Sequence, residues 1–550
     1  PTPTTSAAPA AKTNEAALDD APATTAPAEG SAKKPTTNVI KVVNNWVGKA
    51  AKELKIRLSN VNIKAANEKQ EAAMDVSGSG TTKLELDGQN VLDSSDVCYQ
   101  AGLRKQGEGT LTITDETDDN GNKITAPKSG DSGSLTAKGA TSNGSAGIGG
   151  KTGESTKNII IEGYATVDAT GGGQGAGIGG GGGTAGHVSG DAENIIIRGH
   201  SKVTATAGDG AAIGGGSANG SGNDYVGGSA KGIVIRDYAT VVAKNNGYGA
   251  AIGAAGGSGN HTEAVVTIGT PGATTEDEDV NIIATGFYGS AIGNGAKDTK
   301  VTIQGHSTIW TANIRNSTAI GSKDGNVEVN IKDNVTIDTD NLSANAEPDH
   351  AGSSIGGGDI CGDSNRKVVV NIDGGTNGKV KIGDKIRIFG KYGAISATEV
   401  NIGDNVLLKM RLWKSLDDDK YINVKGTEAA VGTRNNPAAG GLVNTIGDNT
   451  ELWYTDYNGV LQKIVHSKNL CTKHETDHKD ANCTENGWVK YECTFESNKG
   501  ALHPEHKDPW TENTAIDPNA HDYQNDWTVT TPATGHHWKD NGDGTHTCPD

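Results

Sequence analysis

A short phrase of alanine, isoleucine and glycine returns along this chain, and its spacing constrains the fold more than any other feature. The phrase Ala-Gly-Ile-Gly-Gly stands at 146–150 and at 176–180, and shorter versions with the same isoleucine follow. The eight copies place that isoleucine at Ile148, Ile178, Ile213, Ile252, Ile292, Ile320, Ile355 and Ile395. Neighbouring copies lie 28 to 40 residues apart. A repeat of this length indicates a solenoid, a propeller or an array of modules.

The segments between the copies favour a solenoid. Most hold two short β-branched runs bounded by glycine and asparagine, such as 158–161 followed by 165–169, and this composition is typical of strands. Between Asn158 and Asp404 no stretch has the length and the 3.6-residue period of a helix. Two strands and a short Ile-Gly strand per repeat predict one coil of a right-handed parallel β-helix, an all-β fold. A propeller blade would need four antiparallel strands joined by tight hairpins, which the sequence does not show.

The alternation of side chains along a strand predicts which residues face the axis of each coil. In the first clear repeats the residues expected to point inward, and to stack on their equivalents in the next coil, are Ile159, Ile161, Val167, Ala169 and Ile178. Only 33% of the residues are hydrophobic and 79 are glycine. A globular domain of this composition would have a thin core, whereas a coil of a solenoid buries only a narrow interior. We therefore assign residues 38–465 to the β-helix.

The two ends of the chain differ from the repeats. Residues 1–37 are rich in Pro, Thr and Ala and predict a disordered linker, because they have too little apolar surface to fold. A helical turn at Ala50–Leu54 is expected to cap the first coil. Residues 466–550 predict small Cys/His-rich modules, the last of them cut short at Asp550. Disulfides, which are usual in exported chains, or a zinc site would use Cys471, Cys483, Cys493 and Cys548.

Charge and hydropathy exclude two classes of partner. The formal net charge of −18 argues against nucleic acid, since no basic stripe is present to offset phosphates. No apolar run is long enough to cross a bilayer, so we expect no transmembrane segment. The chain begins at Pro1 without a methionine, which suggests a trimmed, exported protein.

The Gly-rich repeats, together with the Cys/His phrases at 481–493 and 535–548, resemble parts of large secreted and wall-anchored proteins of Gram-positive gut bacteria. The β-helical regions of those proteins are usually described as carbohydrate-binding or adhesin-like. The resemblance implies an extracellular location, secreted or associated with the cell wall. It also implies a non-enzymatic function in binding a glycan or a host surface component. The alternatives are a rigid spacer within a larger surface protein and a β-helix polysaccharide lyase or glycoside hydrolase.

One corner of the predicted coils carries a column of rings. The second residue after the last isoleucine of the first strand is glycine or aspartate, and the ring residues that follow it are Tyr164, His200, Tyr238 and His306. Equivalent positions of successive coils lie about 4.8 Å apart, and the insertion after Ile268 is expected to break the column. Such rings suit stacking on sugars. The alternative is that they only stabilise the corner, as cross-strand pairs do.

An acidic loop at 115–122 is the one place where the sequence suggests a cofactor. Its hard oxygen ligands suit calcium, and the candidates are Asp115, Asp118, Asp119 and Asn120. The loop lacks the closing glutamate of an EF-hand, so a solvated turn is the alternative. The binding function itself requires no cofactor.

Overall fold

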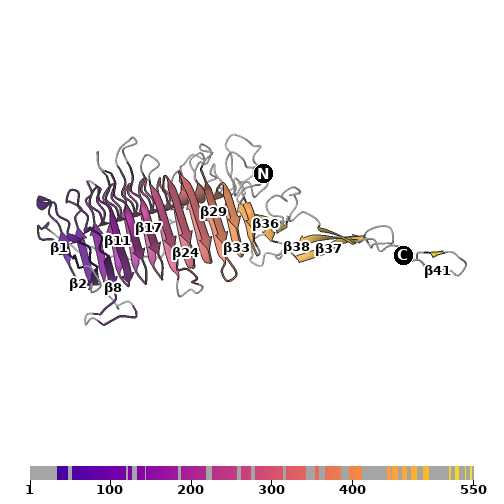
Figure 1. The fold of residues 1–550 in the computed structure, drawn as a ribbon, viewed down its shortest axis with the longest axis horizontal. Coiled ribbons are helices and arrows are strands. Elements are labelled where there is room, and N and C mark those ends of the chain that lie inside the picture. Colours follow the sequence, from indigo (N-terminus) through magenta and orange to yellow (C-terminus); the bar gives the residue numbers. More distant parts are fainter. Residues whose placement is uncertain are drawn as a thin grey trace, which may run out of the picture.

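The computed structural model describes most of the repeat region and short parts of both ends. The described residues are 34–46, 53–118, 122–126, 133–142, 144–183, 188–218, 226–256, 262–273, 279–313, 317–341, 353–357, 366–385, 395–411, 443–447, 449–455, 461–467, 472–479, 487–494, 520–521, 527–531, 539–540 and 546–547. They form a parallel β-helix, in which the coils stack along one long axis (Figure 1). Within these residues there is no α-helix, and the single 3-10 turn is η2 (Asn67–Lys69).

Three sheets run the length of the β-helix. Through most of its length each strand pairs with the strand three places further along the chain, so that the three strands of a coil belong to three different sheets. The Ile-Gly phrases form the narrow sheet of 11 strands, which pair in parallel. Its members are β1 (Ile40–Val43), β4 (Met74–Ser77), β7 (Leu103–Lys105), β10 (Ile148–Gly149), β13 (Ile178–Gly179), β16 (Ile213–Gly214), β19 (Ile252–Gly253), β22 (Ile292–Gly293), β25 (Ile320–Ser322), β28 (Ile355–Gly357) and β31 (Ile395–Ser396).

The second sheet has 12 parallel strands. They are β2 (Leu54–Ser59), β5 (Thr82–Asp87), β8 (Leu111–Asp115), β11 (Thr156–Gly163), β14 (Ala192–Ile197), β17 (Ala230–Ile235), β20 (Glu263–Ile268), β23 (Asp298–Ile303), β26 (Asn326–Lys332), β29 (Val368–Asp373), β32 (Glu399–Ile402) and β34 (Val443–Ile446). The helical turn expected at Ala50–Leu54 falls largely outside the described residues, and its last residue begins β2.

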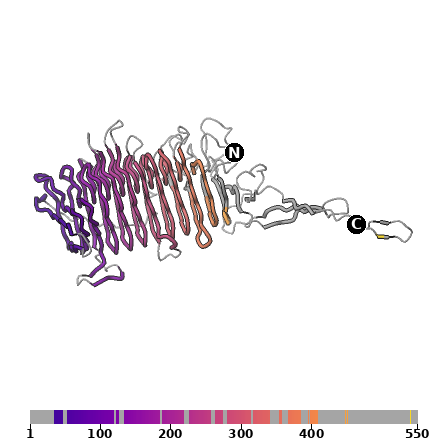
Figure 2. Tube along the Cα trace, viewed as in Figure 1, coloured from indigo at the N-terminus to yellow at the C-terminus, as the bar shows by residue number. Residues whose placement is uncertain are grey.

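The third sheet has 14 strands, of which the first twelve are parallel. They are β3 (Asn62–Lys64), β6 (Gln89–Asp93), β9 (Ser134–Lys138), β12 (Thr166–Thr170), β15 (Lys202–Ala207), β18 (Thr240–Asn245), β21 (Val280–Gly286), β24 (His306–Asn313), β27 (Asn334–Asn341), β30 (Val380–Lys385), β33 (Val406–Arg411) and β35 (Glu451–Thr455). Two antiparallel strands follow, β36 (Leu461–Ser467) and β39 (Ala520–His521). Figure 2 traces the coils from indigo to orange.

Five further strands lie toward the C-terminus. An antiparallel sheet contains β37 (Thr472–Lys479), β38 (Gly487–Thr494) and β40 (Trp527–Thr531), and a two-stranded ribbon contains β41 (Lys539–Asp540) and β42 (His546–Thr547). The parallel stacking of coils therefore gives way to antiparallel pairing in the described residues after β35.

The repeated phrase is explained by the register of the narrow sheet. The eight isoleucines pair in one unbroken column, from Ile148 to Ile395. The glycine that follows most of them has a positive φ, for example +144° at Gly214. A Cβ at Gly214 would collide with the carbonyl oxygen of Gly253 in the next coil. Glycine is needed there because the conformation is left-handed and the neighbouring backbone leaves no room for a side chain.

The core is the set of inward columns that the sequence predicted. Ile159, Ile161, Val167, Ala169 and Ile178 are each at most 1% exposed. Each pairs with an apolar residue in the next coil, as Ile159 does with Ile195 and Val167 with Val203. Burying each Val or Ile side chain contributes about 1.5–3 kcal/mol, and the columns repeat this contribution coil after coil. The predicted parallel β-helix is confirmed.

Candidate functional site

The corner between the second and third sheets carries a stack of three rings. The ring centroids of Tyr164 and His200 are 5.0 Å apart with an angle of 3° between the planes, and those of His200 and Tyr238 are 4.4 Å apart at 25°. These separations are close to the spacing of about 4.8 Å between coils. The rings therefore lie one above another along the axis, like rungs of a ladder.

The backbone of this corner explains why the rings align. The residue before the ring is left-handed in each coil, with φ between 54° and 71° at Gly163, Gly199, Asp237, Gly305 and Asp333. Glycine, asparagine and aspartate adopt this conformation most readily. The same sharp turn therefore recurs in register, and it presents the next side chain at the same place on the outside of each coil.

Stacking covers some of the ring faces that a sugar could use. His200 has a ring on both sides, so neither of its faces is open, and Tyr164 and Tyr238 each have one face against His200. Tyr238 is 37% exposed, which leaves ring edges and the outer faces of the two tyrosines for contact. Each stacked pair contributes about 0.5–1.5 kcal/mol to the stability of the corner, and sugar binding at this column stays a prediction.

The fourth ring of the predicted column, His306, lies apart from the other three. It begins β24, beyond the insertion after Ile268, and among the described residues it stacks on no ring. Its Nδ1 lies 3.3 Å from Oδ1 of Asp279, a residue of that insertion. The insertion thus supplies an acidic partner for His306.

A second ring stack lies at another corner, between the third sheet and the narrow sheet. Tyr248 and Tyr288 are stacked with centroids 4.7 Å apart at 11°, and Phe287 meets Tyr288 edge-on at 4.8 Å and 83°. The sequence reasoning missed this stack. The signal that could have found it is the constant position of the two tyrosines, four residues before Ile252 and Ile292.

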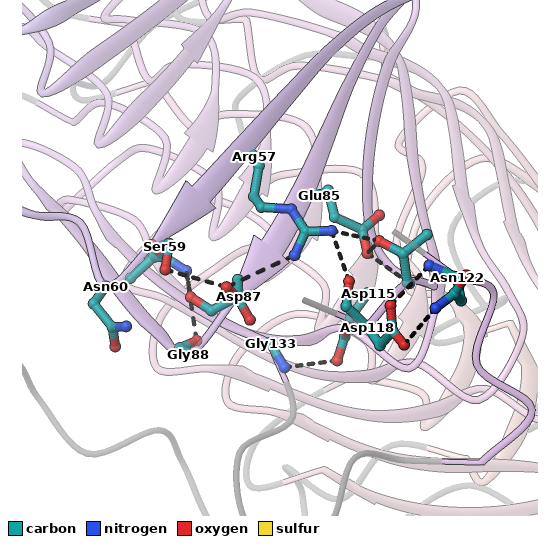
Figure 3. Close-up of polar contacts among 12 residues, drawn as sticks. Arg57, Ser59, Asn60, Glu85, Asp87, Gly88, Asp115, Asp118, Asn122 and Gly133 are labelled. Atoms are coloured by element: carbon teal, nitrogen blue, oxygen red, sulfur yellow. Dashed lines mark hydrogen bonds and ion pairs between the residues drawn. The ribbon is translucent and has the colours of Figure 1, made fainter. Parts of the chain in front are cut away.

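The acidic loop directs its carboxylates to separate partners (Figure 3). Asp115 is buried, and its Oδ2 accepts a hydrogen bond from the backbone N–H of Gly133 at 2.6 Å. Asp118 instead accepts from the backbone and side-chain nitrogens of Asn122, at 2.7 and 3.0 Å. The guanidinium of Arg57 donates to the Asp118 carbonyl at 2.9 Å. Asp118 thus closes the local turn, whereas Asp115 ties the end of β8 to the residue before β9.

The remaining metal candidates fall largely outside what the structure describes. Asp119 and Asn120 lie outside the described residues, as do Cys471, Cys483 and Cys548, while Cys493 lies in β38. Across the described ranges no three His, Cys, Asp or Glu side chains gather as they would around a metal ion. Calcium in the loop, and disulfides or zinc in the C-terminal modules, stay predictions.

A groove of about 670 Å³ lies on the outer face of the second sheet. Residues of β20, β23, β26 and β32, with residues in and next to β29, line it, so it spans five coils. Its charged lining consists of Glu263, Asp298, Lys300, Glu328, Lys367 and Glu399. We refer to it below as the second-sheet groove.

Hydrogen bonds order the polar side chains of the second-sheet groove. Lys300 contacts both carboxylate oxygens of Glu328, at 3.0 and 3.1 Å, and Asn330 donates to the same carboxylate at 2.8 Å. The hydrogen bonds from Asn330 and Lys300 lower the pKa of the Glu328 carboxyl below its ordinary value. Asn371 donates to Asn330, and Asn401 donates to Asn371, each at 2.8 Å. Successive coils therefore present a row of amides, of which Asn371 lines the groove, beside fixed charges.

A smaller pocket of about 290 Å³ contains a buried lysine. Lys105 is 2% exposed, and its Nζ donates to the carbonyls of Gln106 and Gly107 at 3.2 and 3.0 Å. Burial lowers the pKa of this amine to about 8. No carboxylate of the described residues forms an ion pair with it, and Glu108 in the same pocket pairs with Lys157.

The fold defines the chain as a parallel β-solenoid with polar, ring-bearing outer surfaces. No family model matches the sequence, and no curated protein or solved structure is significantly similar to it. None of the helical segments that the structure describes is long and apolar enough to cross a membrane.

Proposed function

We propose that the protein is an extracellular, adhesin-like binding protein that holds a glycan chain in the second-sheet groove. The observation that carries the proposal is the groove itself, which runs over five coils and is lined by charges and amides held in place by one another. Fixed polar groups suit hydroxyl-rich ligands, because such groups lose little freedom on binding.

The lining indicates the chemistry of the ligand. Both signs of charge are present, and the Lys300–Glu328 pair balances one against the other. Two valines in the lining, Val265 at 39% exposure and Val369, stand on either side of this pair in the cross-strand row and offer contact to the C–H faces of sugar rings. This mixture favours a neutral polysaccharide over a highly charged polymer.

The length of the groove predicts how many sugars it holds. The first and last of five strands are about 19 Å apart at 4.8 Å per coil, which corresponds to about four sugar units. Affinity should therefore rise with chain length up to about a tetrasaccharide and then level off.

The test is a glycan array probed with the full chain, followed by titration with an oligosaccharide series of the glycan found. The variant Lys300→Ala with Glu328→Ala removes the ion pair at the centre of the groove. It should weaken binding about tenfold or more, since charged hydrogen-bonding groups typically contribute 1.5–3 kcal/mol.

A matched control removes an ion pair of the same kind elsewhere on the solenoid. Nζ of Lys41 and Oε1 of Glu71 are 2.7 Å apart, the lysine exposed and the glutamate half-buried, and Lys41→Ala with Glu71→Ala should leave binding unchanged. An array without any bound glycan would refute the proposal and favour the spacer. Polysaccharide that is shortened after incubation would refute it in favour of a lyase or hydrolase.

A further inference from the structure

At the corner that carries the second ring stack, each of four successive coils contributes one side chain to a column. We call each of these positions a rung. The four residues lie four positions before isoleucines that pair in register, and they are Gln174, Asp209, Tyr248 and Tyr288. Backbone hydrogen bonds join these loops directly, from Asp209 N to Gly173 O at 2.6 Å and from Tyr288 N to Gly247 O at 2.9 Å. The four side chains therefore form one column on the outside of the solenoid.

The column changes from rings to short polar side chains at Tyr248. The centroids of Tyr248 and Tyr288 are 4.7 Å apart, close to one coil spacing of about 4.8 Å, so the ring faces look along the axis. One face of Tyr248 is covered by Tyr288. The other face is turned toward Asp209, which carries no ring, and Tyr248 is 58% exposed. Tyr248 is thus the end of a stack with one open face.

Polar groups stand on the open side of that face. The Asp209 carboxylate accepts a hydrogen bond from the Tyr248 backbone, while its partial burial raises the pKa of the carboxyl. Gln174 lies one rung further, about 10 Å from the Tyr248 rung at 4.8 Å per coil. The Oε1 of Gln174 lies next to Gly144, in the coil away from Tyr248. An aromatic face and a carboxylate thus lie side by side at the end of the ring stack.

We propose that a pyranose ring stacks on the open face of Tyr248, in the place of the missing ring, and that its hydroxyls bind Asp209. We call this site the Tyr248 shelf. Aspartate is shorter than tyrosine, so a sugar ring can lie over the Asp209 side chain, about 4.8 Å from the Tyr248 ring, which is close to the distance at which Tyr248 and Tyr288 already stack. C–H bonds on one side of a pyranose meet the negative face of the phenol ring favourably.

The carboxylate sets the specificity of the shelf. Asp209 accepts hydrogen bonds from hydroxyl or acetamido groups, but it repels a second carboxylate at close range. Neutral pyranoses should therefore bind, and uronic acids should not. The proposal shares with the proposed function only the class of ligand, since the shelf lies on a different part of the surface from the second-sheet groove.

The experiment titrates the full chain with methyl galactoside, methyl glucoside, methyl N-acetylglucosaminide and methyl glucuronide, up to about 10 mM, the range expected of a single-sugar site. Saturation-transfer NMR reports the binding. At least one neutral pyranoside should bind, and the glucuronide should not. Asp209→Asn should admit the glucuronide, because the repelling charge is gone while the shape is kept.

Variants of the ring separate stacking from other contacts. Tyr248→Ala should weaken binding about fivefold or more, whereas Tyr248→Phe keeps the ring face and should stay within about threefold of the wild type. Tyr99→Ala is the matched control, because Tyr99 is also an exposed tyrosine, at 44%, and should change nothing. Circular dichroism confirms that each variant is folded.

Several results would overturn the shelf. They are the absence of binding by every neutral pyranoside, full binding by Tyr248→Ala, or glucuronide binding by the wild-type protein. The groove is tested separately, because Lys300→Ala with Glu328→Ala leaves the shelf intact. Monosaccharide binding that survives this double change but is lost in Tyr248→Ala supports the shelf even if the groove holds no glycan. If long oligosaccharides still bind the Tyr248→Ala variant and no monosaccharide binds the wild-type protein, the groove is supported and the shelf is not.

Discussion

Replacing the buried lysine at position 105 with methionine should make the protein more stable at neutral pH. Lys105 is 2% exposed, and its ammonium group has two backbone carbonyls as partners but no paired carboxylate among the described residues. Its partner in the preceding coil is Val76, so the position belongs to an apolar column. Methionine has a similar length and no charge, and it can follow the path of the lysine side chain.

The pKa of Lys105 gives the size of the effect. Burial lowers it from the ordinary 10.5 to about 8, and at about 1.4 kcal/mol for each tenfold change in proton affinity this amounts to roughly 3 kcal/mol. Methionine loses the hydrogen bonds to Gln106 and Gly107, which offsets about 1 kcal/mol. We expect Lys105→Met to raise the free energy of unfolding by about 2 kcal/mol at pH 7.

The pH dependence tests the cause. The folded pKa is lower than the unfolded one, so between pH 8 and 10.5 the unfolded chain binds more protons, and the wild-type protein gains stability as the pH rises. The advantage of Lys105→Met should therefore be full below about pH 8 and lost by about pH 10.5.

Urea unfolding at pH 7, 8, 9 and 10, followed by far-UV circular dichroism, measures the difference between the two proteins. Lys41→Met is the control, because Lys41 is 57% exposed and its removal should cost less than about 1 kcal/mol at every pH. The reasoning fails if Lys105→Met is less stable than the wild type at pH 7. It also fails if its advantage is the same at pH 7 and pH 10.

Three further changes probe the core, the narrow sheet and the first ring column. Ile178→Asp places an unpaired charge among stacked apolar side chains and should cost more than about 4 kcal/mol in urea unfolding; a soluble variant of wild-type stability would contradict the inward column. Gly214→Ala should cost about 2–4 kcal/mol, since the residue is left-handed and faces the next backbone, and a neutral effect would show that the coils can separate locally. Tyr164→Ala with Tyr238→Ala should lower stability by about 1–3 kcal/mol and leave glycan binding intact. Lost binding by that folded double variant would instead assign the glycan to the column.

The sequence alone determined the architecture and the core. The spacing of the Ile-Gly phrase predicted the coils, and alternation within each strand predicted that Ile159, Ile161 and Val167 face the axis, as they do. This was possible because both signals are local. The side-chain period of a strand is a property of the backbone, and the coils from Gly149 to Gly356 repeat the same requirement for a left-handed glycine.

Only the tertiary structure decided which outer side chains meet. The sequence predicted that the insertion after Ile268 would break the ring column before His306, but it did not predict that Asp279 of this insertion would contact the His306 ring. The stack that ends at Tyr248, the open face beside Asp209 and the second-sheet groove were not predicted. Outer side chains meet across coils that are 28 to 41 residues apart, as in the contacts of Glu328 with Lys300 and of Asn371 with Asn330. These contacts depend on loop lengths and rotamers, which no local period specifies. The fold therefore follows from the repeat, whereas the arrangement of side chains on the surface follows from how neighbouring coils fit together.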